Sequence, residues 1–358
     1  MSIAEAFTLS LEEILSISVD MRASDLHLTA GLPPMARVYG ELLPLEVGEL
    51  RSTDIRALVY PLLDDKQRAQ LEEDWELDFS YSVPGLSRFR GSIMIQRGSV
   101  DVAFRMIPWS IPHIDDLGLP AITREFSRIP RGLVLVTGPT GSGKTTTLAA
   151  MIGLINQERR VNIVTIEDPI EFLHTHDKAI VRQREVGSDT HSFTNALRNA
   201  MRHDPDVILI GEMRDQISIA IALTAAETGH LVFSTLHTQT APLAVQRIID
   251  VFSDSMRNQI RLQLADTLKG VIAQQILPRA DSEGRVAAVE VLVNTPAVGN
   301  LIREGKEHQL YSALQTGRQV GMQTMDSALA DLCLQGLISR EVALARCINR
   351  TELERMLN

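Results

Sequence analysis

Gly132-Leu-Val-Leu-Val-Thr-Gly-Pro-Thr-Gly-Ser-Gly-Lys-Thr145 is the stretch that decides the fold. An apolar run ends at Thr137, a loop of the pattern G-x-x-x-x-G-K-[ST] follows, and residues 145–155 have the composition of a helix. A strand, a glycine-rich loop and a helix in this order form the phosphate-binding loop of many nucleotide-binding proteins. We therefore predict an ATP site at this loop.

The residues of the loop suit phosphate binding for separate reasons. Glycine lets backbone N–H groups approach and surround phosphate oxygens, and the N-terminus of the following helix adds its positive dipole end. The ammonium of Lys144 can reach the β- and γ-phosphates, and the hydroxyl of Thr145 can bind Mg²⁺. The predicted nucleotide ligands are Gly138, Pro139, Thr140, Gly141, Ser142, Gly143, Lys144, Thr145 and Thr146.

Three further apolar runs resemble buried parallel strands and alternate with helical stretches. They are residues 162–166, 207–210 and 231–236, and together with residues 133–137 they predict an α/β domain with a mostly parallel sheet. Ligands of such domains bind at the carboxyl ends of the strands. The residues that follow the four strand ends are the phosphate loop, Glu167-Asp168, Gly211-Glu212 and His237.

The flanking regions predict the domain organisation. Residues 1–107 mix helical periodicity with alternating strand patterns, which is typical of a separate α+β domain. Residues 108–113 are expected to be a linker, because Pro108 and Pro112 discourage both helix and central strand. Residues 114–358 then form the ATPase domain. Its part from about residue 254 is predicted to be mainly helical, with apolar interruptions at residues 271–277 and 286–293.

Carboxylates at two strand ends are candidates for catalysis. Glu212 is our candidate for positioning and activating water, although Gly211 stands where many P-loop enzymes have an aspartate that helps to hold Mg²⁺. Either Thr145 and water hold most of the metal, with Glu212 acting partly through water, or another carboxylate assists. Glu167 and Asp168 could hold a metal-bound water or orient the attacking one. A turn cap and a solvated carboxylate are the alternative for this pair.

Two histidines and two arginines are further candidates. His230 and His237 flank one strand and lie on opposite faces if it is regular, so we do not expect them to share a metal. His237 could donate a hydrogen bond to the γ-phosphate or to Glu212, while a structural role satisfied by backbone is the alternative for each histidine. Arg97 and Arg105 could reach a neighbouring subunit's γ-phosphate, or they form part of a solvated strand face.

Composition excludes several classes of protein. The net charge of −10 and the 4% of aromatic residues provide little for tracking phosphates or stacking bases, so we expect no nucleic-acid partner. Two cysteines, Cys333 and Cys347, cannot make a four-cysteine metal site. The N-terminus lacks the pattern of a signal peptide and no apolar run approaches membrane-spanning length, which favours a cytoplasmic protein without direct membrane insertion.

These residues together resemble the type IV pilus retraction ATPases, the PilT family, within the secretion ATPase superfamily. The resemblance extends over nearly the whole chain, and its motifs are long and ordered. The most specific pieces are residues 23–34, 131–145, 166–172, 204–215 and 223–232.

The resemblance implies a role for each candidate residue. The phosphate loop is the family's Walker A motif, Glu167 belongs to its Asp box, and Glu212 is the catalytic glutamate of an atypical Walker B motif, which explains Gly211. His230 and His237 belong to the His box, and Arg97 and Arg105 match best the arginines that reach across subunits.

The resemblance also implies an architecture and partners. The N-terminal region corresponds to a PAS-like domain that precedes a RecA-like P-loop ATPase domain. The family forms homohexamers that are peripheral at the inner-membrane base of the pilus machine and contact a platform protein there. ATP hydrolysis by the ring drives pilin back into the membrane, which powers pilus retraction and twitching motility.

One departure from the family keeps alternatives open. Retraction enzymes carry Ala-Ile-Arg-Asn-Leu-Ile-Arg-Glu, whereas this chain has Ala297-Val-Gly-Asn-Leu-Ile-Arg-Glu304, so Gly299 replaces an arginine. The chain is then either a primary or an accessory retraction motor. Pilus-assembly or type II secretion ATPases, a nucleic-acid translocase and a scaffold that binds ATP without hydrolysis are the competing functions. The assembly enzymes usually carry the four-cysteine site, and Lys144 with Glu212 argues against the scaffold.

Overall fold

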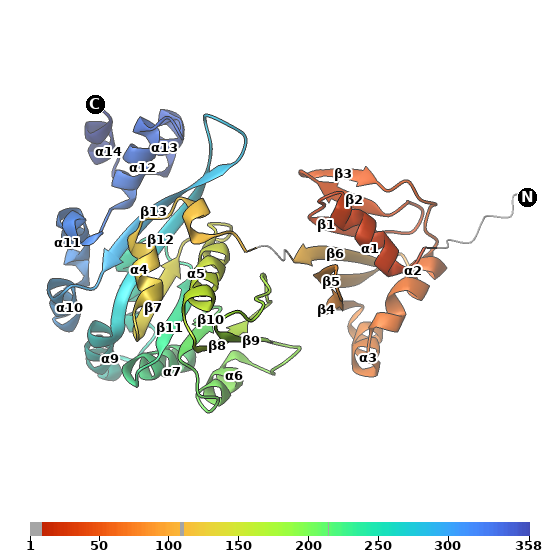
Figure 1. Cartoon of the computed structure of the whole chain (residues 1–358), viewed down its shortest axis with the longest axis horizontal. Helices are drawn as coiled ribbons and strands as arrows, with labels where there is room; N and C mark the ends of the chain where they lie inside the picture. Colours follow the sequence, from red (N-terminus) through yellow and green to blue (C-terminus); the bar gives the residue numbers. More distant parts are fainter. Residues whose placement is uncertain (1–8, 108–110, 214) are drawn as a thin grey trace, which may run out of the picture. The chain divides into compact units, whose positions relative to one another are not determined.

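The computed structural model describes residues 9–107, 111–213 and 215–358. The chain divides into two compact units, one within residues 1–109 and one within residues 110–358, and each is described by itself (Figure 1). Half of the predicted linker, residues 108–110, lies outside the described residues, as does Arg214 within the motif at residues 204–215.

The first unit is a six-stranded antiparallel sheet, in the order β3-β2-β1-β6-β5-β4, with helices packed against it. Its strands are β1 (Asp25–Leu28), β2 (Met35–Val38), β3 (Glu41–Pro44), β4 (Glu76–Val83), β5 (Ser87–Gln96) and β6 (Ser99–Ile107). Its helices are α1 (Leu11–Asp20), α2 (Ser52–Val59), η1 (Tyr60–Leu62) and α3 (Asp65–Asp74).

Local sequence explains how the first unit begins. Ser10 and Glu13 form a capping box, because the Ser10 hydroxyl accepts from the Glu13 amide and the Glu13 carboxylate accepts from the Ser10 amide. The apolar positions of α1, Ile14 and Leu15, are fully buried in the same core as Phe89 of β5. This core belongs to the first unit alone, so the unit has what a separate domain requires.

The second unit contains a seven-stranded sheet in the order β13-β12-β7-β11-β10-β8-β9. Its strands are β7 (Gly132–Thr137), β8 (Asn162–Glu167), β9 (Ile180–Glu185), β10 (Val207–Ile210), β11 (Leu231–Leu236), β12 (Leu268–Pro278) and β13 (Arg285–Val293). All neighbours in this sheet pair in parallel except β12 and β13. The α/β fold and the four predicted parallel strands are confirmed.

Helices cover both faces of this sheet. Its helices are η2 (Ile114–Leu117), α4 (Ile122–Arg128), α5 (Lys144–Glu158), α6 (Phe193–Ala200), α7 (Gln216–Glu227), α8 (Ala241–Asp250), α9 (Asp254–Thr267), α10 (Pro296–Arg303), η3 (Glu307–Gln309), α11 (Leu310–Thr316), η4 (Arg318–Val320), α12 (Met325–Leu334), α13 (Arg340–Arg346) and α14 (Arg350–Leu357). Leu133 and Leu135 of β7 join the core with α6 to α10, whereas Val134 and Val136 join the core with α4 and α5. Side chains on a strand alternate between faces, so one apolar run serves two cores.

The region from residue 254 is mainly helical, with strands at the two predicted apolar interruptions. The apolar interruptions are a long hairpin, β12–β13, that joins the central sheet beside β7. Helices α10 to α14 follow, and Leu277, Ala288 and Leu329 pack in a fourth core with α13 and α14. No described helix combines the length and the apolar character needed to span a membrane.

Candidate active site

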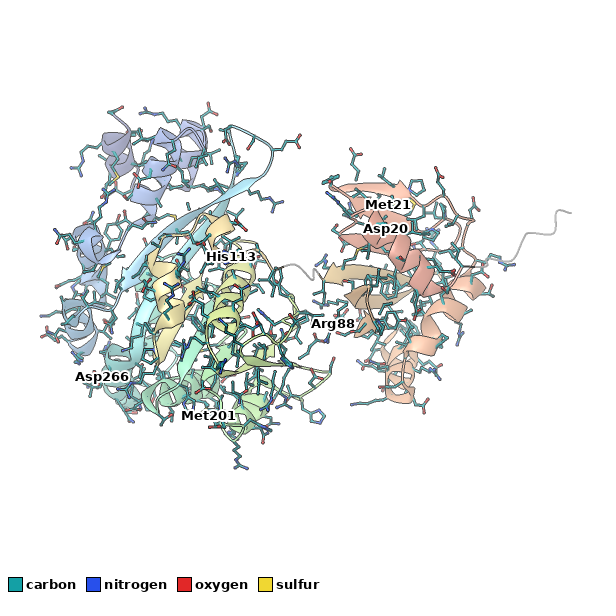
Figure 2. All side chains as sticks on the ribbon, in the orientation of Figure 1. Asp20, Met21, Arg88, His113, Met201 and Asp266 are labelled. Atoms are coloured by element: carbon teal, nitrogen blue, oxygen red, sulfur yellow. The ribbon has the colours of Figure 1, made fainter. Side chains whose placement is uncertain are left out.

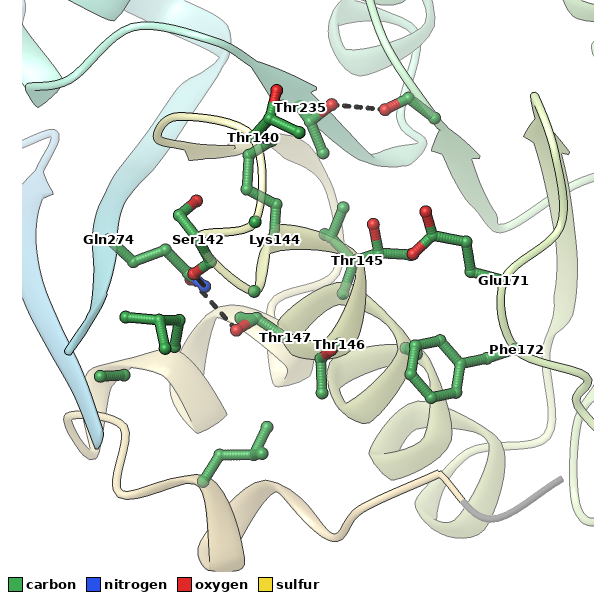
Figure 3. A pocket seen from close by; sticks show the side chains of 18 of the residues that line it. Thr140, Ser142, Lys144, Thr145, Thr146, Thr147, Glu171, Phe172, Thr235 and Gln274 are labelled. Atoms are coloured by element: carbon green, nitrogen blue, oxygen red, sulfur yellow. Dashed lines mark hydrogen bonds between the residues drawn. The ribbon is translucent and has the colours of Figure 1, made fainter. Parts of the chain in front are cut away.

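The carboxyl ends of β7, β8, β10 and β11 surround one cavity of about 690 Å³ in the second unit (Figure 3). The parallel register aligns these ends, because Thr137 pairs with Leu236 and Ile210 pairs with both Ile166 and Ser234. The cavity is lined by Thr140 to Thr146, Glu167, Glu212 and His237. Residues that are distant in sequence are therefore brought together as the carboxyl-end rule predicts.

The phosphate loop needs glycine at specific positions. Gly138, Gly141 and Gly143 all have positive φ, and a Cβ added to Gly138 would lie 2.3 Å from the carbonyl oxygen of Gln274. The Lys144 ammonium donates to the carbonyl oxygens of Gly138 and Pro139 at 2.9 and 3.1 Å. Burial lowers the pKa of Lys144, whereas the nearby carboxylates of Glu212 and Glu171 act in the opposite direction. The Lys144 side chain is thus held against its own phosphate loop by two hydrogen bonds.

Glu212 and His237 meet at the edge of this cavity. Oε1 of Glu212 lies 3.1 Å from Nε2 of His237, and the Glu212 side chain is only 19% exposed. Gly211 is explained by the packing of β10 against β8: its amide donates to the Ile166 carbonyl, and an added Cβ would lie 3.2 Å from that oxygen. A larger residue at position 211 would therefore require the end of β8 to shift by a few tenths of an ångström.

Glu167 is held beneath the cavity rather than in solvent. Its carboxylate accepts from the hydroxyl of Thr165 at 2.6 Å and from the amide of Gln183 at 3.1 Å. Burial raises the pKa of Glu167 despite these two hydrogen bonds. Asp168, which follows it, is exposed and lines the cavity. Of this pair, Glu167 is fixed and Asp168 is open to solvent.

A model of the Type II/IV secretion system protein family matches residues 114–344. The chain belongs to this family. It is 50% identical over 335 residues to the type IV pilus retraction ATPase PilT of Pseudomonas aeruginosa, an alignment that covers 94% of the chain and 97% of that protein. It is 42% identical over 349 residues to the type IV pilus ATPase PilU of the same organism, covering 98% and 91%.

A solved structure agrees with these relatives. The crystal structure of the pilus retraction motor PilT with bound ADP matches with a TM-score of 0.91 and 47% identity, over 97% of this chain and 99% of that one. The chain is therefore an ATPase of the PilT type within the secretion family, and the predicted resemblance is confirmed.

The structure of this secretion ATPase adds residues that sequence patterns missed. Gln183 of β9 donates to Glu167 and to the Phe172 carbonyl, and it accepts from the amide of His174. Burial lowers the pKa of His174 to about 4, so this cavity-lining imidazole is neutral at neutral pH. β9 has no long apolar run, because only Ile180 and Val181 of its residues are apolar, and it is the edge strand of the sheet. A search of the sequence for apolar runs therefore does not identify β9 as a strand of this sheet.

Oxygen ligands gather near the first turn of α5. Figure 3 shows the side chains of Thr145 and Glu171 pointing toward each other in the cavity. Glu171 and Asp168 are further carboxylates that line the cavity. The cavity thus offers hydroxyl and carboxylate oxygens on the side of the loop where Thr145 begins the helix.

Three candidate residues lie elsewhere. His230 sits at the opposite end of β11 from His237, where its Nδ1 is 2.9 Å from the Ala225 carbonyl and 3.2 Å from the Thr228 hydroxyl, so it does not line the cavity. Arg97 is exposed at the β5–β6 turn of the first unit. Arg105, on β6, pairs with Asp25 at 2.9 Å. Neither arginine belongs to the unit that carries the cavity.

Proposed function

We propose that the chain is an ATP-hydrolysing homohexameric motor that powers type IV pilus retraction. The observation that carries this proposal is the Glu212–His237 pair, which faces the phosphate loop across one cavity in a chain that matches PilT over almost its whole length. The bound ADP of the related PilT structure supports an adenine nucleotide as the ligand of this cavity.

The residues of the cavity suit hydrolysis of the γ-phosphate. Loop amides and Lys144 bind the phosphates, and the carboxylate of Glu212 accepts a hydrogen bond from the attacking water. The water oxygen bonds to the γ-phosphorus, the bond to the β,γ-bridging oxygen breaks, and the water proton passes to Glu212 and on to solvent. The products are ADP and inorganic phosphate. His237 orients Glu212, and the buried Glu167 with Asp168 shapes the polar wall opposite.

The described residues contain no group of three or more His, Cys, Asp or Glu side chains that could hold a metal ion by themselves, so Mg²⁺ in this cavity would take most of its ligands from the nucleotide and water. The Thr145 hydroxyl and the carboxylates of Glu212, Asp168 and Glu171 are hard oxygen ligands that line the same space. Thr145 would hold the ion directly and Glu212 partly through water. When bound, Mg²⁺ supplies positive charge against the phosphate oxygens.

Three assignments concern residues outside the cavity. We propose that Arg97 and Arg105, from a PAS-like domain at residues 1–107, act on the nucleotide of a neighbouring RecA-like domain at residues 114–358. The exposure of Arg97 and of the Arg105–Asp25 pair leaves both guanidinium groups accessible to a neighbour. His230 holds the C-terminal end of α7, since its Nδ1 lies near the carbonyl of Ala225 in that helix and near the hydroxyl of Thr228, which caps it.

Similarity to pilus ATPases supports a proposal for the cellular setting. We propose a cytoplasmic location, peripheral at the inner-membrane base of the pilus machine, with a platform protein as partner. The higher identity to PilT than to PilU favours a primary retraction motor, whereas Gly299 keeps an accessory role as the second candidate.

Two experiments test the proposal. Purified hexamer should release inorganic phosphate from ATP only when Mg²⁺ is present, and absence of release would reject the motor. Deletion of the gene should give cells with excess surface pili and no twitching. Cells without pili would instead indicate an assembly ATPase.

A further inference from the structure

Strand β12 extends past the end of β7 and continues beside the phosphate loop. The last residue of β7, Thr137, pairs with Ala273, so Gln274 is the first residue of β12 beyond that end. Ile272 packs in the core with α5, and alternation along the strand places Gln274 on the same face. A glutamine therefore enters a nearly continuous apolar strand where the loop passes by, and its side chain is buried.

The amide of Gln274 contacts both ends of the loop's turn into the helix. Its Nε2 donates to the Ser142 carbonyl at 2.6 Å. Its Oε1 accepts from the Thr147 hydroxyl at 3.1 Å, the bond that Figure 3 marks beside Gln274. Both polar ends of one side chain are thus used, one on the loop and one on the first turns of α5. The bond to the Ser142 carbonyl leaves the loop amides, which are the groups that bind phosphate, available.

Two glycines of the phosphate loop lie so close to Gln274 that a side chain there would contact it. A Cβ on Gly143 would lie 3.1 Å from Nε2 of Gln274, and one on Gly138 would lie 2.3 Å from the Gln274 carbonyl oxygen. The glycines of the motif therefore permit close approach of β12 as well as of a ligand.

We propose that Gln274 is a positioning residue that holds the phosphate loop in its binding shape before nucleotide arrives. A loop that is already ordered loses less conformational entropy on binding, so the contact acts through affinity. The inference deepens the proposed function, because it rests on this loop being the nucleotide site.

Gln274→Met tests the proposal, since methionine keeps the length and burial but loses both hydrogen bonds. Gln275→Met is the matched control: Gln275 is the neighbouring glutamine of β12 and faces the other side of the sheet. For Gln274→Met we expect the Kd for ADP, measured by calorimetry, to rise roughly tenfold. We expect the KM for ATP to rise similarly, with kcat at saturation within about twofold of the parent.

Hydrogen exchange separates positioning from a general loss of structure. Amides of residues 141–147 should exchange faster in Gln274→Met without nucleotide and return to parental rates at saturating ADP, while the rest of the sheet is unchanged. If Gln274→Met does not fold, Thr147→Val removes one of the two bonds and should give a several-fold weaker Kd with the same exchange pattern.

The outcomes are distinct. An unchanged Kd and unchanged loop exchange in Gln274→Met, or in Thr147→Val if that variant is used, would overturn the proposal while leaving the ATPase intact. Failure of the parent protein itself to bind ADP would reject the proposed function instead.

Discussion

Oε1 of Glu212 lies 3.1 Å from Nε2 of His237, across the carboxyl ends of the neighbouring strands β10 and β11. The Glu212 side chain is mostly buried and the imidazole of His237 is half exposed, so the glutamate is the more buried partner of the pair. This contact holds the carboxylate and the imidazole side by side at the edge of the cavity.

Glu212→Gln should separate binding from hydrolysis. Glutamine keeps the size of the side chain and can still meet His237, but it cannot accept a proton from water. We expect kcat to fall roughly 10²- to 10⁴-fold, with the Kd for ADP nearly unchanged. Phosphate release and calorimetry measure the two quantities. Hydrolysis at the parental rate would remove Glu212 from its assigned role.

Lys144→Ala should act on binding first. Its ammonium is held by the Gly138 and Pro139 carbonyls, within reach of phosphates that the loop binds. Loss of charge-assisted hydrogen bonds should weaken ADP binding roughly 10- to 100-fold. Lys178→Ala, at an exposed lysine outside the cavity, is the control and should bind as the parent does. Equal affinities in the two variants would contradict the assignment.

Arg97→Ala and Arg105→Ala should impair only the assembled ring. The Arg105–Asp25 ion pair is exposed, so its loss should leave the first unit folded. Mixing either variant with Lys144→Ala subunits should restore part of the ATPase activity, because each partner supplies what the other lacks. Arg51→Ala, which removes another exposed ion pair of the same unit, is the control. Mixtures that never regain activity would argue against arginines acting between subunits.

Sequence patterns predicted the four strands whose carboxyl ends line the cavity, but they did not predict the residues that contact the loop and Glu167 from other strands. The four apolar strands and the loop are local features, and parallel pairing then places Glu212 beside His237. Gln183 and Gln274 act through side-chain hydrogen bonds to residues distant in sequence, which leave no periodic signal in the chain. His230 was grouped with His237 by motif, yet a strand of six residues separates the two ends. The residues that sequence analysis missed are those whose role depends on a contact with a distant part of the chain, which composition does not indicate.

Glu290 should give the fold a measurable pH dependence. This buried carboxylate on β13 accepts from the amides of Ala241 and Met325, and burial, aided by the charge of Asp326, raises its pKa from 4.5 to about 7. Between these values the folded chain holds a proton that the unfolded chain has lost, so stability falls as pH rises through this interval and levels off above it. The fall is at most about 3 kcal/mol.

Glu290→Gln should remove that contribution. We expect urea unfolding at pH 5 and pH 8 to show a smaller loss of stability in the variant than in the parent, and the difference between the two proteins isolates Glu290 from other titrating groups. Glu283→Gln, at an exposed glutamate of the β12–β13 turn, should retain the parental slope. Identical slopes in all three proteins would show that Glu290 does not titrate in this range.

Gly299→Ala should stabilise the protein. Gly299 lies in α10, which is fastened to α9 by the Arg303–Asp266 ion pair (Figure 2 labels Asp266), and an added Cβ would lie 3.5 Å from the Ala265 carbonyl, an ordinary contact. Replacing a helical glycine by alanine then contributes up to about 1 kcal/mol. Thermal or urea unfolding measures the gain.

Gly270→Ala provides the contrast for this prediction. Its Cβ would lie 2.1 Å from the buried ring of Phe126, so the same substitution should destabilise the chain there. A loss of stability at position 299 as well would mean that α10 does not accommodate a methyl group.

The strand that carries the phosphate loop has β11 on one side and β12 on the other. A chain cut short before Leu268 would lose β12, and β7 would become an open border with a row of unpaired N–H and C=O groups. Such a border invites pairing with a second molecule. The segment from residue 268 onward is thus part of the ATPase fold, because β12 covers the edge of β7 and prevents it from pairing with another molecule.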